Sequence, residues 1–372
     1  MASERVRQST DERAKLVVIS TRMSKVSIQI VTWNSLRFLP DCLESIFNQT
    51  FRDWAVLIID NNSSDHSVDY VEKNWPQVKA LKNSRNAGFA RANNQGIAST
   101  DSEYVLVMNP DVILEPEFLT EIITIADKKK RAASLAPKLL KMKFHHIDHC
   151  DHTTQEQQSS SAMINPDWCV IKTDILDSTG LLMKKTRRFV DRGEGEKDEG
   201  QYDKQTDIFG ASGACVLYRR KSLADVKMKD VGIREEYFDE DFFAYQEDVD
   251  LAWRLKWRGW QAIYAPSAIA YHVRQISATH RFQKSGLVNF LSYRNHLWLL
   301  VKNEALANFC RNFLFIFFYQ TIKVFYLLFT QPGVILRGEF SYWSKVFLML
   351  KKRGQIMRRR RVSSAKIREY IK

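Results

Sequence analysis

The chain has 372 residues, of which 45% are hydrophobic, 12% aromatic and 27% charged, and its formal net charge at pH 7 is +13. This length fits one large domain with an appendage or two modest domains, and the hydrophobic content excludes a wholly disordered chain. The positive charge indicates anionic partners such as phosphates, nucleic acid or acidic lipid. Residues 351–372 contain ten Lys or Arg and one Glu, so most of the excess charge lies at the C-terminus.

Neither the N-terminus nor the cysteine content indicates a secreted protein. Residues 1–24 contain no apolar run long enough for a signal peptide, and we expect a loose lead-in there. Whether Met23, just before the first expected strand, is the true start stays open. The cysteines are few, odd in number and widely spaced, which favours reduced thiols over a disulfide framework. They are Cys42, Cys150, Cys169, Cys215 and Cys310.

Short apolar runs alternate with helical patterns in the first half of the chain. This alternation predicts an α/β fold with a mostly parallel central sheet. Ligands of such sheets bind outside the carboxyl ends of the strands, so Asp60 and Asn109-Pro110-Asp111, which end or follow two strands, should share one edge. The expected elements are a strand over 26–32, a helix over 36–47, a strand over 55–60, a helix ending near Asn74, a helix over 89–98 and a strand over 103–108.

Residues 141–207 differ from the segments around them because they are polar and rich in charge. We expect an irregular, mobile insertion between two halves of one domain and a candidate active-site flap. Beyond it, a strand is expected over 208–220 and a charged helix over 241–258. The insertion contains several potential zinc ligands, but their spacing matches no usual zinc site. These are His145, His146, His149, Cys150 and His152.

Residues 304–372 combine apolar-aromatic clusters with the basic tail. Phe313–Tyr319 is a run of seven apolar residues that Gln320 and Lys323 then interrupt, so a membrane-spanning helix is disfavoured. Amphipathic helices beside a polybasic segment are typical of a protein that lies in the plane of an anionic membrane face. The alternative is helices that pack on the catalytic domain, with a tail that only solubilises.

Two carboxylates at the predicted sheet edge have a functional and a structural interpretation. Asp60 can accept the N3–H of a uracil or thymine base, or its segment can simply start a helix with Ser64 or Asp65 as cap. Asp111 can bind a divalent metal that neutralises a diphosphate leaving group. The alternative for Asp111 is a plain Asn-Pro-Asp turn.

Residues 237–250 interleave acids with aromatic residues, which argues against a fully solvated acidic helix. Asp248 is a candidate general base that takes the proton of a sugar hydroxyl. A calcium loop is rejected, because Ala244 stands where its turn glycine belongs and Phe243 occupies a ligand position. Further along, His272 can complete a metal shell or contact a diphosphate, although a lone histidine is more often structural.

Taken in order, these clusters resemble glycosyltransferase family 2, the inverting enzymes of GT-A fold. The similarity runs from Val26 to about Asn303. It implies a Rossmann-like GT-A single domain over 25–303, followed by the C-terminal amphipathic helices. The motifs that carry it are VTWNS, DNNSSD, NAGFARANNQGI, NPDV, GASGACVLYRR, FDEDFFAYQEDVDLAWRLKWRGW and YHV.

Within the family, the chain is similar to bacterial rhamnosyltransferases that build the cell envelope. They share the NPD motif and a segment like that from Asp177 to Asp203. The resemblance implies dTDP-L-rhamnose as donor and a polyprenyl-diphosphate-linked saccharide as acceptor. It also implies a peripheral location on the cytoplasmic face of the cell membrane. No nucleic-acid partner is expected, and formation of a homo-oligomer stays open.

The resemblance also implies roles for individual residues. Asp248 would be the general base and Glu247 would orient the acceptor, while Asp111 and His272 would hold Mg²⁺ or Mn²⁺. Asn109 departs from the Asp-x-Asp motif of many GT-A enzymes and removes one carboxylate from the metal shell. The implied donor-binding residues are Thr32, Asn34, Asp60, Asn86, Gly88, Asn93, Asn109 and Asp111. The implied phosphate-binding residues are Arg192, Arg254 and His272.

The mechanism implied by the resemblance is a single displacement that inverts the anomeric carbon. One alternative keeps the fold and changes the donor to UDP-galactofuranose or another UDP-hexose. Another is a non-catalytic scaffold that binds membrane or nucleic acid through its basic tail. The joint presence of Asp60, Asp111 and Asp248 argues against a scaffold, which has no need of carboxylates at that edge.

Overall fold

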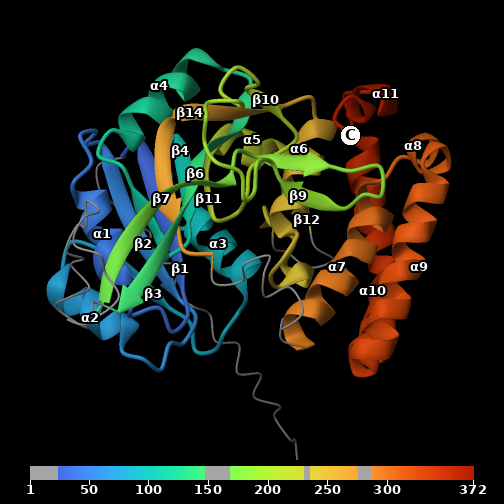
Figure 1. Cartoon of the computed structure of the whole chain (residues 1–372), viewed down its shortest axis with the longest axis horizontal. Helices are drawn as coiled ribbons and strands as arrows, with labels where there is room; N and C mark the ends of the chain where they lie inside the picture. The colour runs from blue at the N-terminus through green and yellow to red at the C-terminus, as the bar shows by residue number, and fades with distance from the viewer. Residues whose placement is uncertain (1–23, 147–167, 230–234, 275–285) are drawn as a thin grey trace, which may run out of the picture.

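The structure is a computed structural model, and it describes residues 24–146, 168–229, 235–274 and 286–372. A mixed sheet with helices packed on it forms the N-terminal part, and the last helices stand side by side at the opposite end of the molecule from the first two (Figure 1). The first elements are β1 (Val26–Thr32), α1 (Leu39–Phe47), β2 (Trp54–Asp60), α2 (Ser67–Asn74), β3 (Lys79–Lys82), α3 (Phe89–Ala98), β4 (Tyr104–Met108), β5 (Val112–Leu114) and α4 (Phe118–Lys128).

The alternation predicted for the first half is confirmed. β1 pairs in parallel with both β2 and β4, and β2 pairs in parallel with β3. Ile28 on one face of β1 and Gln29 on the other are both fully buried, as expected for a strand covered on both faces. The carboxyl ends of β1, β2 and β4 therefore lie at one edge, which brings Asp60 and the turn after Met108 to the same side of the sheet.

The second half of the chain completes the sheet in the order β10-β14-β6-β11-β4-β1-β2-β3, with β5 on β14 and β7 on β6. β11 runs antiparallel to both neighbours, and β14 runs parallel to β6. These elements are β6 (Ala132–His146), β7 (Trp168–Ser178), β8 (Leu181–Met183), β9 (Phe189–Asp191), β10 (Asp207–Ile208), β11 (Cys215–Arg219), α5 (Arg220–Val226), β12 (Met228–Lys229), β13 (Glu235–Glu236), η3 (Glu240–Phe242), α6 (Glu247–Trp257) and β14 (Gln261–His272).

The described part of the polar insertion is not irregular, which corrects the expectation for 141–207. β7 pairs with β6, and β8 and β9 form a hairpin. The polar residues are ordered because they find partners far away in the sequence. Lys138 Nζ lies 2.8 Å from Asp198 Oδ2, for example, and the Lys138 side chain is largely buried. Residues 147–167, with most of the histidine-rich stretch, lie outside the described residues.

The charged helix predicted over 241–258 begins later, at Glu247. The preceding residues form the short 3-10 helix η3 and then a loop with left-handed backbone at Phe243, Tyr245 and Gln246, whose φ angles are 66°, 70° and 69°. No α-helix can pass through such residues. The FDED motif is therefore part of a loop that leads into α6.

The C-terminal helices are α7 (Gly286–Asn303), α8 (Leu306–Arg311), α9 (Phe313–Thr330), α10 (Pro332–Arg358) and α11 (Ser364–Arg368). α9 is the one helix of the described chain that is long and apolar enough to cross a membrane, and 11% of it is buried. The inner face of α10 joins the core through Met349 and Ile356, while Phe340 and Phe347 on the same helix are 79% and 82% exposed. Packing on the core of the sheet domain thus accounts for one face of α10 only.

Candidate active site

Asp60, the last residue of β2, is held as an oriented acceptor at the sheet edge. Its Oδ1 accepts a hydrogen bond from Thr32 Oγ1 at 3.0 Å and one from Ser63 Oγ at 2.5 Å. Its Oδ2 accepts from the backbone N–H of Ser63 at 3.0 Å. The turn after β2 thus fixes the carboxylate, while Asp65 accepts from Ser67 at the start of α2. His66 is the cap residue of α2, so the expectation of Ser64 or Asp65 as cap is wrong, although the Asp65 carboxylate does accept from the first residue of the helix.

Asn34 lies beside this turn and is exposed. Its backbone N–H donates to Ser63 Oγ at 2.9 Å, and its Oδ1 accepts from the backbone N–H of Ser64 at 2.8 Å. The residue has a φ of 53°, in the left-handed region that Asn tolerates better than most residues. Asn34 and Asp60 are therefore linked through Ser63 in one rigid turn.

The NAGF motif continues the same edge through Asn61, whose Nδ2 donates to Gly88 O at 3.3 Å. Asn86 Oδ1 accepts from the backbone N–H of Gly88 at 2.9 Å. Gly88 has a φ of +83°, and a Cβ there would lie 2.5 Å from a ring carbon of Phe243. Glycine is required on both grounds, because the backbone is left-handed and the neighbouring ring leaves no space.

Asn93 lies one helical turn into α3 and is fully buried. Its Nδ2 donates to Phe89 O at 2.9 Å. Its Oδ1 has no hydrogen-bond partner among the described residues. Buried amide oxygens are usually satisfied, so this one is either free for a ligand or bridged by water.

Asp111 and His272 face each other across the antiparallel pair of β5 and β14, in which Val112 is opposite His272. Asp111 Oδ1 lies 3.5 Å from His272 Nε2, which is too long for a well-formed hydrogen bond. No other described group donates to this buried oxygen. On its other side, His272 Nδ1 lies 2.8 Å from Asp177 Oδ2.

This pair fits a divalent cation in the type of its ligands, since a carboxylate oxygen and an imidazole nitrogen lie 3.5 Å apart. Burial alone lowers the pKa of His272, but the interactions with Asp111 and Asp177 outweigh it and raise the pKa to about 10. The carboxylates of Asp111 and Asp177 thus favour a positive charge at or beside the His272 imidazole. Among the described residues no group of three or more His, Cys, Asp or Glu forms a metal cluster. Water and diphosphate oxygens would have to supply the remaining ligands, as is usual for Mg²⁺.

Glu247 and Asp248 begin α6; the Glu247 side chain is buried and that of Asp248 is half-buried. Asp248 Oδ2 accepts from the backbone N–H of Gly213 and Oδ1 from that of Val249, each at 2.8 Å. Burial nevertheless raises the pKa of Asp248 to about 6. Burial, followed by the charge of Asp248, raises the pKa of Glu247 to about 8.

A loop joins the candidate base to the candidate metal turn. Gly213 donates to Asp248, and the next residue, Ala214, accepts from the backbone N–H of Asn109 at 2.8 Å. Asn109 is two residues before Asp111. The structure therefore brings Asp248 and the NPD turn into one neighbourhood.

Sequence reasoning missed a group of charged residues beside His272. Arg274 Nε lies 2.9 Å from Asp177 Oδ1, and the guanidinium also pairs with Asp191 and Glu194. The charge of Asp191 in turn helps to raise the pKa of Asp248. Arg274 thus lies between the candidate metal pair and the candidate base. The available signals were its place two residues after the YH motif and the acids of the DSTG and DRGEGE segments.

The sequence model of glycosyl transferase family 2 matches residues 27–227, more than half of the chain. The chain belongs to glycosyl transferase family 2. Over 259 residues it is 26% identical to an N-acetylglucosaminyl-diphospho-decaprenol L-rhamnosyltransferase of Mycobacterium tuberculosis (strain ATCC 25618 / H37Rv), covering 65% of this chain and 74% of that protein. Over 171 residues it is 28% identical to an uncharacterized glycosyltransferase of Escherichia coli (strain K12), covering 43% of this chain and 41% of that protein. The chain is a glycosyltransferase.

A solved structure of GalNAc-T7 with UDP, GalNAc and Mn²⁺ has a similar fold. The TM-score is 0.52 and the sequence identity 12%, and the match covers 76% of this chain and 48% of that one. At this identity the likeness concerns the fold alone. It agrees with the GT-A fold predicted from the motifs.

Two arginines assigned to phosphate in this family 2 transferase have structural contacts instead. Arg254 is 2% exposed, and its Nε lies 2.8 Å from Asp250 Oδ2, while its other two nitrogens donate to backbone carbonyls. Arg192 is also buried, and its three nitrogens donate to Thr179 and to Gln205 O. Because all of these nitrogens have protein partners, the geometry gives no support to phosphate binding by either arginine.

Proposed function

We propose that this transferase moves L-rhamnose from dTDP-L-rhamnose onto a polyprenyl-diphosphate-linked saccharide in cell-wall or surface-polysaccharide synthesis. The support for the donor and acceptor is the similarity to the Mycobacterium tuberculosis enzyme, whose name specifies an L-rhamnosyl group and a diphospho-decaprenol acceptor. The observation that best supports the reaction is that Gly213 and Ala214 connect Asp248 to the NPD turn through hydrogen bonds.

The proposed reaction is a single displacement. The acceptor hydroxyl gives its proton to Asp248 and attacks the anomeric carbon from the side opposite the dTDP group, so the configuration inverts. A pKa of about 6 lets Asp248 be ionised at neutral pH and still accept a proton. Burial keeps the Glu247 acid largely neutral there, so that it can donate a hydrogen bond to the acceptor.

At the donor end, Asp60 would accept the N3–H of the thymine base through its oriented carboxylate. Asn34, Asn86 and Asn93 would contact the rest of the nucleotide sugar from the same edge. A Mg²⁺ or Mn²⁺ ion held by Asp111 and His272 would neutralise the charge of the departing diphosphate.

We place the enzyme peripherally on the cytoplasmic face of the cell membrane, where a polyprenyl-linked acceptor is anchored. The support is the exposed apolar surface of α9 and α10 together with exposed Lys351 and Arg358 at the end of α10. Basic residues next to an apolar helical surface favour anionic lipid.

The test measures release of free nucleoside diphosphate by the purified protein with Mg²⁺ or Mn²⁺. dTDP-rhamnose is compared with UDP-hexoses in the presence of a short lipid-diphosphate-sugar acceptor, and Asp248→Asn is assayed alongside. Acceptor-dependent dTDP release that disappears in the variant supports both the donor and the base. Turnover with a UDP-sugar alone would exclude the rhamnosyl donor and keep the mechanism.

A further inference from the structure

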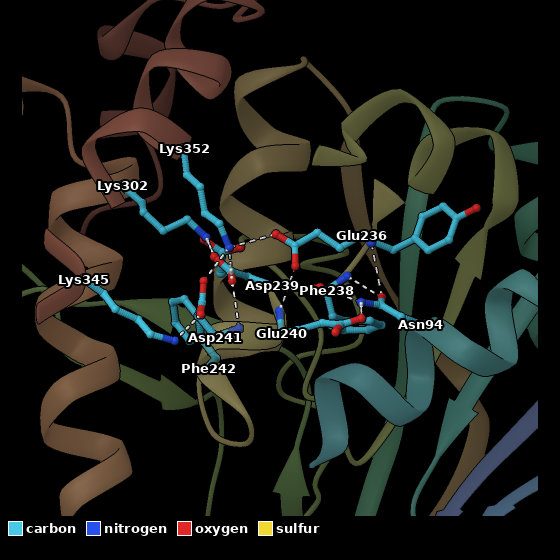
Figure 2. Close-up of polar contacts among 12 residues, drawn as sticks. Asn94, Glu236, Phe238, Asp239, Glu240, Asp241, Phe242, Lys302, Lys345 and Lys352 are labelled. Atoms are coloured by element: carbon cyan, nitrogen blue, oxygen red, sulfur yellow. Dashed lines mark hydrogen bonds and ion pairs between the residues drawn. The ribbon is translucent and has the colours of Figure 1, made fainter. Parts of the chain in front are cut away.

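The loop before α6 contains a deeply buried cluster of charges. We call residues 236–246 the acidic loop. Lys352 of α10 directs its Nζ at three of its carboxylates, at 2.8 Å from Glu236, 2.5 Å from Asp239 and 2.8 Å from Asp241. Lys302 of α7 also pairs with Asp239 (Figure 2). Lys302, Lys352 and Asp239 are at most 2% exposed.

These ion pairs hold the acidic loop tightly against the C-terminal helices α7 and α10. Buried ions are stable only when paired, so moving α10 away from the loop would strand its carboxylates in the protein interior. The Asn295 side chain of α7 adds contacts to the loop backbone, because its Nδ2 lies within hydrogen-bond distance, 2.8 to 3.0 Å, of Phe242 O, Ala244 O and Tyr245 O. Left-handed residues lie in this stretch, and these contacts stabilise their strained conformation.

The opposite side of the acidic loop contacts the donor side of the sheet. The backbone N–H of Ala90 in α3 donates to Phe243 O at 3.1 Å. Asn94 of α3 donates from Nδ2 to Phe238 O and accepts at Oδ1 from the N–H of Phe238, both at 2.8 Å (Figure 2). The loop then runs directly into Glu247 and the proposed base. It therefore connects three parts: the donor side, the base and α10.

The outer surface of α9 and α10 is apolar and uncovered among the described residues. An exposed apolar surface of this kind marks a lipid or protein contact, and the many exposed Phe side chains of α9, a helix that buries only Ile316 and Leu327, favour lipid. Exposed lysine and arginine near the C-terminal end of α10 match an anionic surface. The large apolar side chains that are at least 45% exposed here are Phe313, Leu314, Phe315, Phe317, Phe318, Ile322, Phe325, Leu328, Phe329, Leu336, Phe340, Trp343, Phe347 and Leu350.

We infer that α10 transmits contact with an anionic bilayer to the proposed base, and that Lys302 and Lys352 are positioning residues for Asp248. The outer face of the helix lies on the lipid, and its inner face holds the acidic loop that sets the start of α6. The inference rests on the proposed role of Asp248. It adds that the membrane raises the turnover rate, beyond concentrating the acceptor there.

The first test uses the full-length protein with vesicles that contain phosphatidylglycerol, compared with neutral vesicles. Hydrogen exchange of residues 236–250 should slow severalfold on anionic vesicles, and kcat with a water-soluble acceptor analogue should rise. A Phe340→Ser/Phe347→Ser variant should keep its basal activity in solution and lose both responses. The inference is overturned if the wild type does not bind the vesicles, or if it binds them with unchanged exchange and kcat. If a partner protein slows exchange and vesicles do not, lipid is likewise excluded as the molecule that covers the outer surface of α9 and α10.

The second test is made in solution without vesicles and compares Lys352→Met with Lys351→Met, which removes an exposed lysine from the same helix. Lys352→Met should lower kcat at least tenfold, move the acid limb of the kcat–pH profile and leave the KM for the donor within twofold. Lys351→Met should match the wild type. If Lys352→Met does not fold, Asp241→Asn replaces it, because it removes one carboxylate partner of Lys352 and leaves two. A smaller decrease in kcat is then expected. A folded variant with wild-type kcat would refute the positioning role. Hydrogen exchange does not depend on catalysis. Slower exchange on anionic vesicles without the expected changes in kcat would therefore show that Asp248 is not the base, while leaving the link between α10 and the acidic loop intact.

Discussion

Asp248 lies against a glycine, because its Oδ2 accepts the backbone N–H of Gly213 at 2.8 Å. A Cβ at Gly213 would lie 3.3 Å from that same oxygen, which forces the carboxylate to move by a few tenths of an ångström. We expect Gly213→Ala to lower kcat about tenfold or more, since small displacements of a reacting group are costly. Nucleotide affinity should not change. Steady-state kinetics beside Gly354→Ala, where a Cβ meets nothing within 4 Å, provides the comparison.

The pH dependence should follow the two carboxyl groups at the start of α6. Burial raises the pKa of Asp248 to about 6, so below this pH the base is protonated and inactive. The logarithm of kcat should therefore rise with unit slope below about pH 6 and level off above it. Asp248→Asn should lose about 10²–10⁴-fold in kcat. Glu247, whose pKa is raised to about 8, is mostly protonated at pH 7, so Glu247→Gln should retain far more activity. Equal losses in both variants would contradict this division of roles.

Metal dependence should reside in Asp111 and His272. Chelation with EDTA should abolish activity, and Mg²⁺ or Mn²⁺ should restore it. Asp111→Asn should raise the metal concentration needed for half-maximal activity by about tenfold or more, because one anionic ligand is lost from a site with few protein ligands. The exposed Asp101→Asn serves as control. Full activity of Asp111→Asn in EDTA would exclude this site.

Asp191 should tune the base through its charge. Removing a negative charge near Asp248 makes the ionised form of that carboxyl less costly, so its pKa falls. We expect Asp191→Asn to move the acid limb of the kcat–pH profile to lower pH. Glu194→Gln breaks a different ion pair of the same Arg274 and is the matched control, with a smaller shift. A shift to higher pH in Asp191→Asn would contradict this assignment.

Local patterns predicted the parts of the fold that depend on neighbours in sequence. β1 and α3 have the expected bounds, since an apolar run and a helical repeat each define them without distant partners. The start of α6 was predicted wrongly because Lys302 and Lys352, more than fifty residues away, hold the acidic loop in a non-helical form. No local pattern carries that information.

The residues of the candidate site likewise fall into those that local motifs identify and those whose role depends on distant partners. The motifs identified Asp60 at the end of β2, Asp111 in the turn between β4 and β5, and Asp248 in the first turn of α6. Arg274 was missed because its role depends on acids contributed by β7, β9 and the turn that follows. The polar insertion was taken for an irregular segment for a similar reason, since its charges look solvated until their partners are placed.

Arg254 provides a direct test of a structural against a phosphate-binding role. Its guanidinium pairs with buried Asp250 and donates to two backbone carbonyls, so its removal leaves those carbonyls without a partner and Asp250 with Lys302 as its remaining cation. We expect Arg254→Leu to lose about 2–3 kcal/mol in the free energy of unfolding. The exposed Arg358→Leu should lose almost nothing. Urea denaturation gives the stability, and titration with dTDP gives the affinity, which should stay unchanged in whatever fraction is folded. Weaker dTDP binding at unchanged stability would instead assign Arg254 to the diphosphate.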